Sequence, residues 1–308
     1  MMSISKNRPM KNLSIPGIIP LILLTLFLSC QARAERVSGP PGKVYTYKET
    51  KEGKRELEVY FPKNHESAKG PVPCIIFFHG GGWSGGSRDA FKYQCAYFAS
   101  RGIVAATVTY RLTNKKDKAT MKGKESPKRL CIPDAKSAIR WVKQHAKDLG
   151  VDPDRLIVSG GSAGGHIGLI ATSHSGLNHP DDPKGLNTTV AARVLFNPAL
   201  SSGDANDPEI DVIQHLKPGA PPTIAFFGSK DTWLKGWTPA YEKWKSLENT
   251  LIEVQIAEGQ SHAFFNSQPW ADLTLAAADE FLQKQGLLTG PPTLPKFAGS
   301  EKLVPVSK

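Results

Sequence analysis

The fold is decided by one stretch of the sequence, Leu156-Ile157-Val158-Ser159-Gly160-Gly161-Ser162-Ala163-Gly164-Gly165. An apolar run typical of a buried strand leads into a turn that fits the pattern G-x-S-x-G, and small residues typical of a helix follow. Glycines on both sides of Ser162 let strand and helix pass closely, and the strained turn lifts the serine hydroxyl. A phosphate-binding loop or a plain glycine-rich turn is the alternative, but the spacing fits neither G-x-G-x-x-G nor G-x-x-x-x-G-K. We therefore predict that Ser162 is a catalytic nucleophile.

Strands and helices alternate along the chain around this turn. The predicted strands are Val44–Glu49, Arg55–Phe61, Cys74–Phe78, Ile103–Tyr110, Leu156–Ser159, Ala192–Asn197, Thr223–Phe227 and Ile252–Ala257. The predicted helices are Ala90–Ser100, Pro133–Leu149, Ala163–Thr172, Asp207–His215, Pro239–Leu247 and Ala271–Gln285. The alternation indicates an α/β fold with a mostly parallel central sheet and helices on both faces. We expect one domain over residues 35–289, without a large cap domain, and a proline-rich surface tail over residues 290–308.

Functional residues of such a sheet lie just after the carboxyl ends of its strands. The run His79-Gly80-Gly81-Gly82-Trp83 follows one buried strand. Consecutive glycines let the main chain turn its N–H groups toward a site, although alone the run would be an ordinary flexible turn. We predict that the N–H groups of Gly81, Gly82 and Ala163 form an oxyanion hole. His79 is expected to brace this loop by hydrogen bonds rather than to transfer protons.

A general base and a carboxylate that orients it are expected later in the chain, in the order Ser, Asp, His. Asp231 comes just after the strand that ends at Phe227, and His262 comes just after the strand that ends at Ala257. Singly, Asp231 could be a helix N-cap and His262 a loop histidine. Their order and position together predict that Asp231 orients His262 and that His262 takes the proton of Ser162.

Aromatic side chains flank these residues. Trp83, Trp233, Phe264 and Phe265 lie next to the predicted triad or oxyanion loop, and we predict that they bind substrate. The alternative is that they are core or rim residues. His166 lies in the helix after Ser162, where we expect a packing or hydrogen-bonding role, and Asp134 at a helix start is expected to be a cap or an ion-pair partner.

Composition excludes several classes of protein. The chain has 308 residues, 40% of them hydrophobic and 22% charged, with a net charge of +11. This is an ordinary globular composition, unlike that of a disordered chain or a polytopic membrane protein. The lysine runs Lys115-Lys116 and 122–129 are interpreted as solvated loops, and no motif beside them indicates nucleic-acid binding. We expect no cofactor and no metal, because no Cys or His cluster has zinc-ligand spacing. The oligomeric state stays open.

The N-terminus reads as an export signal. Residues 1–12 are basic and polar, residues 13–28 are apolar, and Ala32-Arg33-Ala34 ends the segment in the way a signal peptidase requires. We predict a signal peptide over residues 1–34 and a periplasmic or extracellular protein. An uncleaved anchor is one alternative. The other is a lipoprotein box at Leu28-Ser29-Cys30, in which the lipid on Cys30 would provide the only contact with a membrane.

Export would place the remaining cysteines in an oxidising compartment. They are Cys74, Cys95 and Cys131, so at least one thiol stays unpaired within the chain. Cys74 opens a buried strand and is expected in the core. Cys95 and Cys131 are the better candidates for a bridge.

Taken together, His79 to Trp83, the Gly160 to Gly165 turn, Lys230-Asp231 and Ser261-His262 resemble the α/β-hydrolase superfamily. Within it, the chain is most similar to hormone-sensitive-lipase-type esterases and to exported bacterial carbohydrate and feruloyl esterases. The resemblance covers about residues 43–289. It implies a serine esterase with the triad and oxyanion hole given above, and a bridge between Cys95 and Cys131. The helical N-terminal cap of the larger lipase-type members is not expected here, which favours short acyl groups.

The expected partner is therefore a small-molecule or oligosaccharide ester, such as an acetylated or feruloylated carbohydrate. A serine peptidase or amidase of the same fold is an alternative, since the same triad serves both bonds. A non-catalytic binding protein on this fold is a further alternative, although such proteins generally lose a triad residue.

Overall fold

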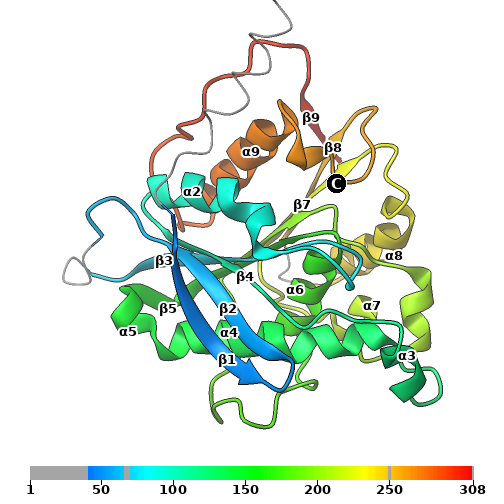
Figure 1. Cartoon of the computed structure of the whole chain (residues 1–308). Coiled ribbons are helices and arrows are strands. Elements are labelled where there is room, and N and C mark those ends of the chain that lie inside the picture. The colour runs from blue at the N-terminus through cyan, green and yellow to red at the C-terminus, as the bar shows by residue number, and fades with distance from the viewer. Residues whose placement is uncertain (1–40, 66–69, 249–250, 307–308) are drawn as a thin grey trace, which may run out of the picture. The chain divides into compact units, whose positions relative to one another are not determined.

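A central β-sheet organises the chain, as the computed structural model shows for residues 41–65, 70–248 and 251–306. Its strands are β1 Lys43–Thr50, β2 Gly53–Tyr60, β3 Val72–Phe78, β4 Val104–Val108, β5 Val151–Gly161, β6 Ala192–Phe196, β7 Thr223–Gly228, β8 Ile252–Ala257 and β9 Leu303–Pro305. In these described residues the sheet has nine strands in the order β1-β2-β4-β3-β5-β6-β7-β8-β9 (Figure 1). Neighbours from β4 through β3 to β8 pair in parallel, whereas β1, β2 and β9 are antiparallel to their neighbours. The predicted α/β fold with a mostly parallel sheet is confirmed.

Helices cover both faces of the sheet. The α-helices are α2 Lys92–Ser100, α3 Asp117–Thr120, α4 Ile132–Gln144, α5 Ala146–Leu149, α6 Ala163–Ser173, α7 Val212–His215, α8 Leu234–Lys245 and α9 Trp270–Lys284. Short 3-10 turns cover Arg88–Phe91, Pro127–Cys131, Ser202–Asn206 and Phe264–Asn266. Helices α2 and α9 lie on one face, and α4, α6 and α8 contribute to the core on the other (Figure 1).

Each face of the sheet has its own apolar core. Successive side chains of a strand point to opposite faces. In β3, Ile76 and Phe78 therefore pack in the core under α4, α6 and α8, whereas Ile75 and Phe77 pack in the core under α2 and α9. A strand buried on both faces needs a continuous apolar sequence, and this is the pattern that located β3.

This arrangement explains why the predicted Cys95–Cys131 bridge is wrong. All three cysteines of the described chain are free and buried. Cys95 belongs to the core under α2 and α9, and Cys131 belongs to the core on the opposite face. The sheet lies between the two thiols, and a disulfide requires Cα atoms less than about 7 Å apart. Cys74 is a core residue, as expected.

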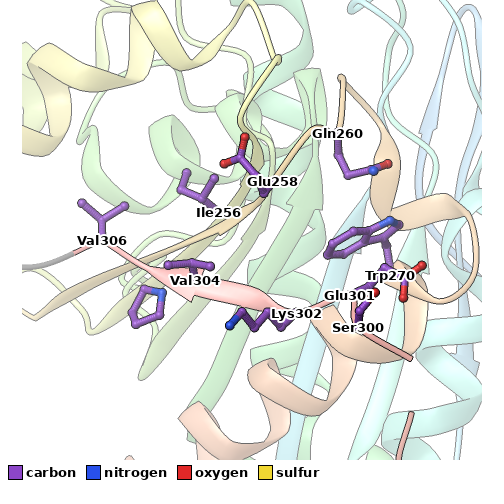
Figure 2. A pocket seen from close by; sticks show the side chains of 10 residues that line it. Ile256, Glu258, Gln260, Trp270, Ser300, Glu301, Lys302, Val304 and Val306 are labelled. Atoms are coloured by element: carbon purple, nitrogen blue, oxygen red, sulfur yellow. The ribbon is translucent and has the colours of Figure 1, made fainter. Parts of the chain in front are cut away.

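Several predicted segments differ from the structure. The helix predicted over Pro133–Leu149 is divided into α4 and α5, and the helix predicted over Pro239–Leu247 is α8, which begins at Leu234. The helix expected over Asp207–His215 shortens to α7, because Asp211 caps it through the Ile213 N–H and Asp207 is bound to Arg129. The segment 290–308, expected to be a surface tail, contributes β9, which pairs with Gln255–Ala257 of β8. A cavity between β8, β9 and Trp270 is lined by residues of this C-terminal segment (Figure 2).

The predicted signal segment and Cys30 lie outside the described residues. In the part of the chain that the structure describes, no helix combines the length and apolar character needed to cross a membrane.

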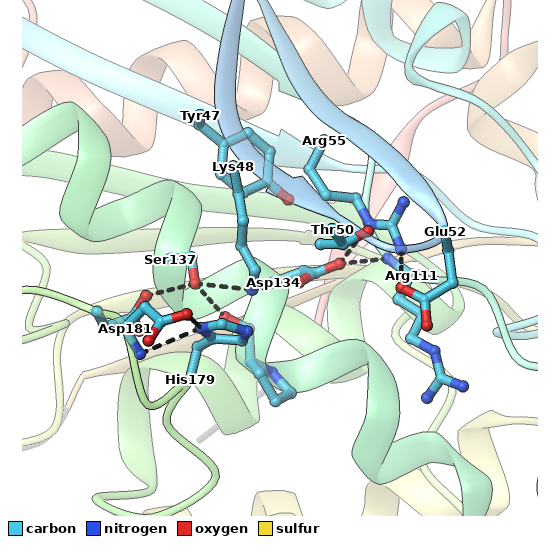
Figure 3. A network of polar contacts seen from close by, with 12 residues as sticks. Tyr47, Lys48, Thr50, Glu52, Arg55, Arg111, Asp134, Ser137, His179 and Asp181 are labelled. Carbon is cyan, nitrogen blue, oxygen red and sulfur yellow. Dashed lines mark hydrogen bonds and ion pairs between the residues drawn. The ribbon is translucent and has the colours of Figure 1, made fainter.

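A buried ion-pair cluster ties the β1–β2 hairpin to α4. The carboxylate of Asp134 accepts hydrogen bonds from the Lys48 ammonium (2.5 Å), the Arg55 guanidinium (2.7 Å) and the Arg111 backbone N–H (2.8 Å) (Figure 3). Burial favours the neutral acid, but the Lys48 and Arg55 cations outweigh it and lower the pKa of Asp134. The expected role of Asp134 as an ion-pair partner is confirmed.

Candidate active site

The turn at Ser162 joins β5 to α6 in a strained conformation. Ser162 has φ 53° and ψ −120°, which is uncommon for a residue with a side chain. The turn is held because the Ser162 N–H donates to the Phe196 carbonyl at 2.9 Å. A Cβ at Gly164 would lie 2.0 Å from the Phe78 carbonyl oxygen, so only glycine lets α6 start this close to β3. The glycine spacing of the motif is therefore a packing requirement.

Three side chains meet at this turn in a chain of hydrogen bonds. The Ser162 Oγ lies 2.9 Å from His262 Nε2, and His262 Nδ1 lies 2.8 Å from Asp231 Oδ2. The other oxygen of Asp231 accepts the Trp233 N–H at 2.9 Å. The Asp231 side chain is fully buried and that of His262 is 30% exposed. A buried carboxylate on Nδ1 favours the tautomer with its proton there, so Nε2 is free to accept the serine proton.

Parallel strands bring these residues together from distant parts of the sequence. Ser162 follows β5, Asp231 follows β7 and His262 follows β8, and the strands from β5 to β8 are consecutive in the sheet. Their carboxyl ends lie along one edge. The loops after these strands are short, so each side chain stays within reach of the next.

The loop after β3 presents free N–H groups beside Ser162. Gly81 has φ 119°, and a Cβ there would lie 2.2 Å from the Gly85 carbonyl oxygen. The carbonyl of Gly81 points into the loop, where it accepts the Gly85 N–H at 2.9 Å. Among the described residues, the N–H groups of Gly81, Gly82 and Ala163 donate to no protein acceptor. They therefore remain available to an oxygen anion.

His79 braces this loop from behind. Its Nδ1 lies 2.7 Å from the Gly80 carbonyl oxygen, and its ring stacks on Tyr110 at 4.3 Å between centroids. The Tyr110 hydroxyl donates to the His79 carbonyl at 2.6 Å. Burial lowers the pKa of His79 and keeps the imidazole neutral.

Trp83 ends the loop and is held by a buried histidine. Its backbone has φ 63°, and its indole N–H donates to His166 Nδ1 at 3.3 Å. The other ring nitrogen of His166 lies 2.9 Å from the Ile210 carbonyl oxygen, which requires a proton on Nε2. His166 is therefore neutral, and burial lowers its pKa to about 4. The expected packing and hydrogen-bonding role of His166 agrees with these contacts.

The indole of Trp83 connects the oxyanion loop with the histidine of the triad. The Lys128 ammonium lies 3.9 Å from its ring centroid and forms an ion pair with Asp204 at 2.5 Å. Trp233 meets Trp83 edge-to-face at 6.1 Å between centroids, and Trp233 lies 6.3 Å from the ring of His262. Trp233 is half-buried beside His262, whereas Trp83 is 7% exposed and belongs to the core under α4, α6 and α8. The role of both rings in substrate binding stays a prediction.

Phe264 and Phe265 lie elsewhere than the sequence prediction placed them. They are 6% and 4% exposed and belong to the core under α2 and α9. Phe265 packs against Phe91 and Phe196, and Phe264 packs against Trp270. The Ala263 backbone at φ 65° turns the chain inward after His262. The two rings therefore pack in the core that supports the His262 loop, and they do not face a substrate.

Sequence reasoning missed Asn197 as a residue that supports the site. Asn197 follows β6 with φ 38° and is fully buried. With its amide oriented to suit its neighbours, its oxygen accepts the Ala263 N–H at 2.5 Å and its nitrogen donates to the Phe196 carbonyl at 2.6 Å. It holds the chain directly after His262. Its place at a strand end on the catalytic edge is the signal that could have found it.

Side chains that could bind a metal are dispersed. Across residues 41–65, 70–248 and 251–306, no group of three or more His, Cys, Asp and Glu side chains is arranged to hold an ion.

Comparisons with known proteins identify relatives of this arrangement. Residues 57–198 match the family model described as BD-FAE. The solved structure of a thermophilic esterase from Thermogutta terrifontis, with propionate bound, is 32% identical, covers 82% of this chain and 97% of its own, and has a TM-score of 0.72.

Two curated relatives match over smaller shares of their own length. The carboxylesterase NlhH of Mycobacterium tuberculosis is 33% identical over 115 residues, which is 37% of this chain and 32% of the relative. The arylacetamide deacetylase of Bos taurus is 25% identical over 258 residues, which is 81% of this chain and 58% of the relative. The chain thus spans about a third to somewhat over half of these two proteins. The fold, the serine turn and the solved esterase together show that this chain belongs to the α/β-hydrolase superfamily, among its carboxylic ester hydrolases.

Proposed function

We propose that the protein is a serine esterase that cleaves short-acyl esters through Ser162, His262 and Asp231. The observation that carries this proposal is the hydrogen-bonded chain from Ser162 Oγ through His262 to the buried Asp231, at 2.9 and 2.8 Å. These distances lie within the range required of a nucleophile and its general base. The strained Ser162 backbone supports the same reading, because strain of this kind concentrates at functional sites.

Acylation begins when Ser162 Oγ attacks the ester carbonyl carbon and His262 Nε2 takes the serine proton. The carbonyl oxygen becomes an anion, which the N–H groups of Gly81, Gly82 and Ala163 stabilise. A single such donor is worth on the order of 3 kcal/mol in the barrier. Asp231 stabilises the imidazolium that forms. His262 then gives its proton to the leaving alcohol, and the acyl group stays on Ser162.

Deacylation repeats these steps with water. His262 takes a proton from a water molecule, the hydroxide attacks the acyl carbonyl, and the same N–H groups stabilise the second anion. The bond to Ser162 Oγ breaks as His262 returns the proton to it, and the acid leaves.

Short acyl groups are favoured by what lies beside Ser162. Trp83 is 7% exposed, is fixed by His166 and meets Trp233 edge-to-face. We infer that these packed indoles limit the length of the acyl chain. Structures of the Thermogutta terrifontis esterase were solved with propionate and with butyrate bound, both of which are short carboxylates.

The alcohol part is proposed to be a carbohydrate. The half-buried ring of Trp233, which lies beside His262, suits the apolar face of a sugar. The proposed export over residues 1–34 supports the same substrate class, because acylated polysaccharides lie outside the cell.

N-terminal sequencing of the exported protein would test the cleavage, and labelling with a radioactive fatty acid would test lipid attachment at Cys30.

Amide hydrolysis is the second candidate function. It is favoured by the similarity to arylacetamide deacetylase, whose name refers to an amide substrate. Matched substrates, 4-nitrophenyl acetate and 4-nitroacetanilide, separate the two. We expect kcat/KM on the ester to exceed that on the amide by several orders of magnitude.

The main test is hydrolysis of 4-nitrophenyl acetate, butyrate and octanoate by the wild-type protein and by Ser162→Ala. The expected result is a rate that falls with chain length and that is lost in the variant. A fluorophosphonate probe should label the wild-type protein at Ser162 only. Equal rates for the wild type and the variant, without labelling of Ser162, would refute the proposal.

A further inference from the structure

Residues 111–131 form a strongly basic connection between β4 and α4, here called the lysine segment. It contains six lysines and two arginines but only two acidic residues, Asp117 and Glu125. Such an excess within 21 residues creates a local positive potential. The connection carries α3 and a 3-10 turn at Pro127–Cys131.

The cations of the lysine segment divide into those that pair with an acidic side chain and those that do not. Three of them have acidic partners and hold the base of the segment: Arg111 pairs with Asp117 at 2.8 Å, Lys128 pairs with Asp204, and Arg129 pairs with Asp207. The other five are exposed and form no ion pair in the described part of the chain; they are Lys115, Lys116, Lys118, Lys122 and Lys124. The folded chain therefore leaves these five charges uncompensated.

The segment is anchored beside the catalytic residues. The Trp83 carbonyl accepts hydrogen bonds from the Thr113 N–H at 2.8 Å and from the Cys131 thiol at 3.8 Å, so both ends of the segment meet the end of the oxyanion loop. Lys128 covers the Trp83 ring at 3.9 Å. The five unpaired lysines project from a connection whose base touches the active site.

A groove runs along the same segment. It has a volume of about 950 Å³ and is lined by residues of the β1–β2 turn and of the lysine segment. Figure 3 shows polar side chains of this lining, among them Glu52, Arg111 and His179. Arg111, Arg129 and His179 supply donors to its lining, and Glu52 and Glu125 supply acceptors. A lining that both donates and accepts hydrogen bonds suits the hydroxyl groups of a sugar chain.

We propose that the lysine segment binds acidic polysaccharides, sugar chains with carboxylates beside their acyl groups, and presents them to Ser162. This inference rests on the proposed esterase function and adds the charge of the substrate. The segment contains no aromatic residue on which nucleic-acid bases could stack. None of the exposed large hydrophobic residues of the described chain, Val44, Phe297, Val304 and Val306, lies in it, so it lacks an apolar anchor for a lipid surface.

Electrostatic attraction makes a distinct prediction about salt. A field from exposed charges raises the rate of association with an opposite charge by on the order of 10-fold to 1000-fold, and ions screen it over about 10 Å at 0.1 M salt. The kcat/KM on an acidic polymer should therefore fall steeply with salt, whereas that on a neutral polymer should change little.

The experiment compares acetylated polygalacturonate with acetylated xylan that lacks uronic acid side chains. The lysine variant carries Lys→Gln changes at 115, 116, 118, 122 and 124. The matched control carries Lys→Gln changes at five exposed lysines that form no ion pair in the described chain, lie outside the lysine segment and do not line the groove: 63, 147, 184, 217 and 284. Both variants lose five charges, so the net charge changes equally. Circular dichroism and the melting temperature verify that both variants fold.

We expect the ratio of kcat/KM on the acidic polymer to that on the neutral polymer to fall about tenfold in the lysine variant at about 20 mM NaCl. The control variant should keep the wild-type ratio, and about 500 mM NaCl should abolish the difference. Equal ratios in the two variants would overturn the proposal. So would binding of the segment to anionic phospholipid vesicles or single-stranded DNA with higher affinity than to polygalacturonate.

Failure of the proposed esterase function gives a different result. In that case neither polymer nor 4-nitrophenyl acetate is hydrolysed. Affinity electrophoresis with polygalacturonate that carries no ester still measures binding: retardation of the wild type and the control, lost in the lysine variant, supports the inference about the segment. Equal migration of all three proteins contradicts it.

Discussion

One buried histidine, His166, should contribute strongly to the pH dependence of stability near pH 5. Its Nδ1 accepts the Trp83 indole N–H, and its Nε2 proton faces the Ile210 carbonyl. A second proton could bind only at Nδ1, where it would break the hydrogen bond from Trp83. Burial lowers its pKa from the usual 6.5 to about 4. The unfolded chain therefore takes up the proton first as the pH falls. The stabilisation is complete above about pH 6.5 and is lost between 6.5 and 4.

The magnitude follows from the difference between the two pKa values. A shift of one unit corresponds to about 1.4 kcal/mol, so the linkage predicts a loss of about 2 kcal/mol between pH 7.5 and pH 5, and about 3 kcal/mol by pH 4. His166 has no exposed surface, so solvent does not screen this effect. A domain with an ordinary stability of about 5–15 kcal/mol would lose a measurable share of it.

The assay is urea denaturation at pH 7.5, 6.5, 5.5 and 5.0, followed by tryptophan fluorescence, for the wild type and for His166→Asn. The asparagine oxygen can replace Nδ1 as the acceptor for Trp83 but cannot titrate. Subtracting the two curves removes the contribution of the carboxylates. His145→Asn, a change at a half-buried histidine stacked on Trp141, serves as the matched control.

We expect the free energy of unfolding of the wild type to fall by about 2 kcal/mol more than that of His166→Asn between pH 7.5 and 5.0. The His145→Asn protein should follow the wild type. Parallel curves for the wild type and His166→Asn would refute the argument that His166 is held neutral by burial.

The remaining predictions concern catalysis and the cysteines. Asp231→Asn should lower kcat by on the order of 10⁴-fold with little change in KM, because the neutral amide no longer selects the His262 tautomer; steady-state kinetics on 4-nitrophenyl acetate test it, and a loss below tenfold would count against the assigned role. Gly81→Ala should lower kcat by on the order of 100-fold or more, because the new Cβ would meet the Gly85 carbonyl oxygen at 2.2 Å and displace the N–H groups; a kcat like that of the wild type in a folded variant would exclude Gly81 from the oxyanion hole. Non-reducing peptide mapping of the folded protein should recover Cys95 and Cys131 as free thiols, and a disulfide-linked peptide would contradict the placement of the two residues on opposite faces of the sheet.

The parts of the fold that could be predicted from the sequence are those that depend on neighbouring residues. The continuous apolar run of β3 and the glycine pattern around Ser162 each express a local requirement: burial on both faces for the first, close passage of strand and helix for the second. Asp231 and His262 could be assigned to the catalytic edge because residues after parallel strands share an edge.

The predictions that were wrong concern contacts between distant segments. Cys95 and Cys131 were the better candidates for a bridge because Cys74 opens a buried strand, but nothing in the sequence says which face of the sheet each one occupies. The strand β9 has only three residues and forms because it finds the edge of β8, a pairing that its own composition does not indicate. Phe264 and Phe265 follow His262 directly, but the turn at Ala263 directs both rings into the core.

By itself, the sequence determined the α/β class and the serine turn, and it predicted the three side chains that the structure brings together, because apolar period, glycine position and strand ends are properties of short segments. Only the tertiary structure decided how those side chains are supported. The Trp83–His166 hydrogen bond joins residues 83 positions apart, and Asn197 holds the chain after His262 from another strand end. Such contacts depend on distances and directions set by the packing of the whole sheet, which no local pattern contains.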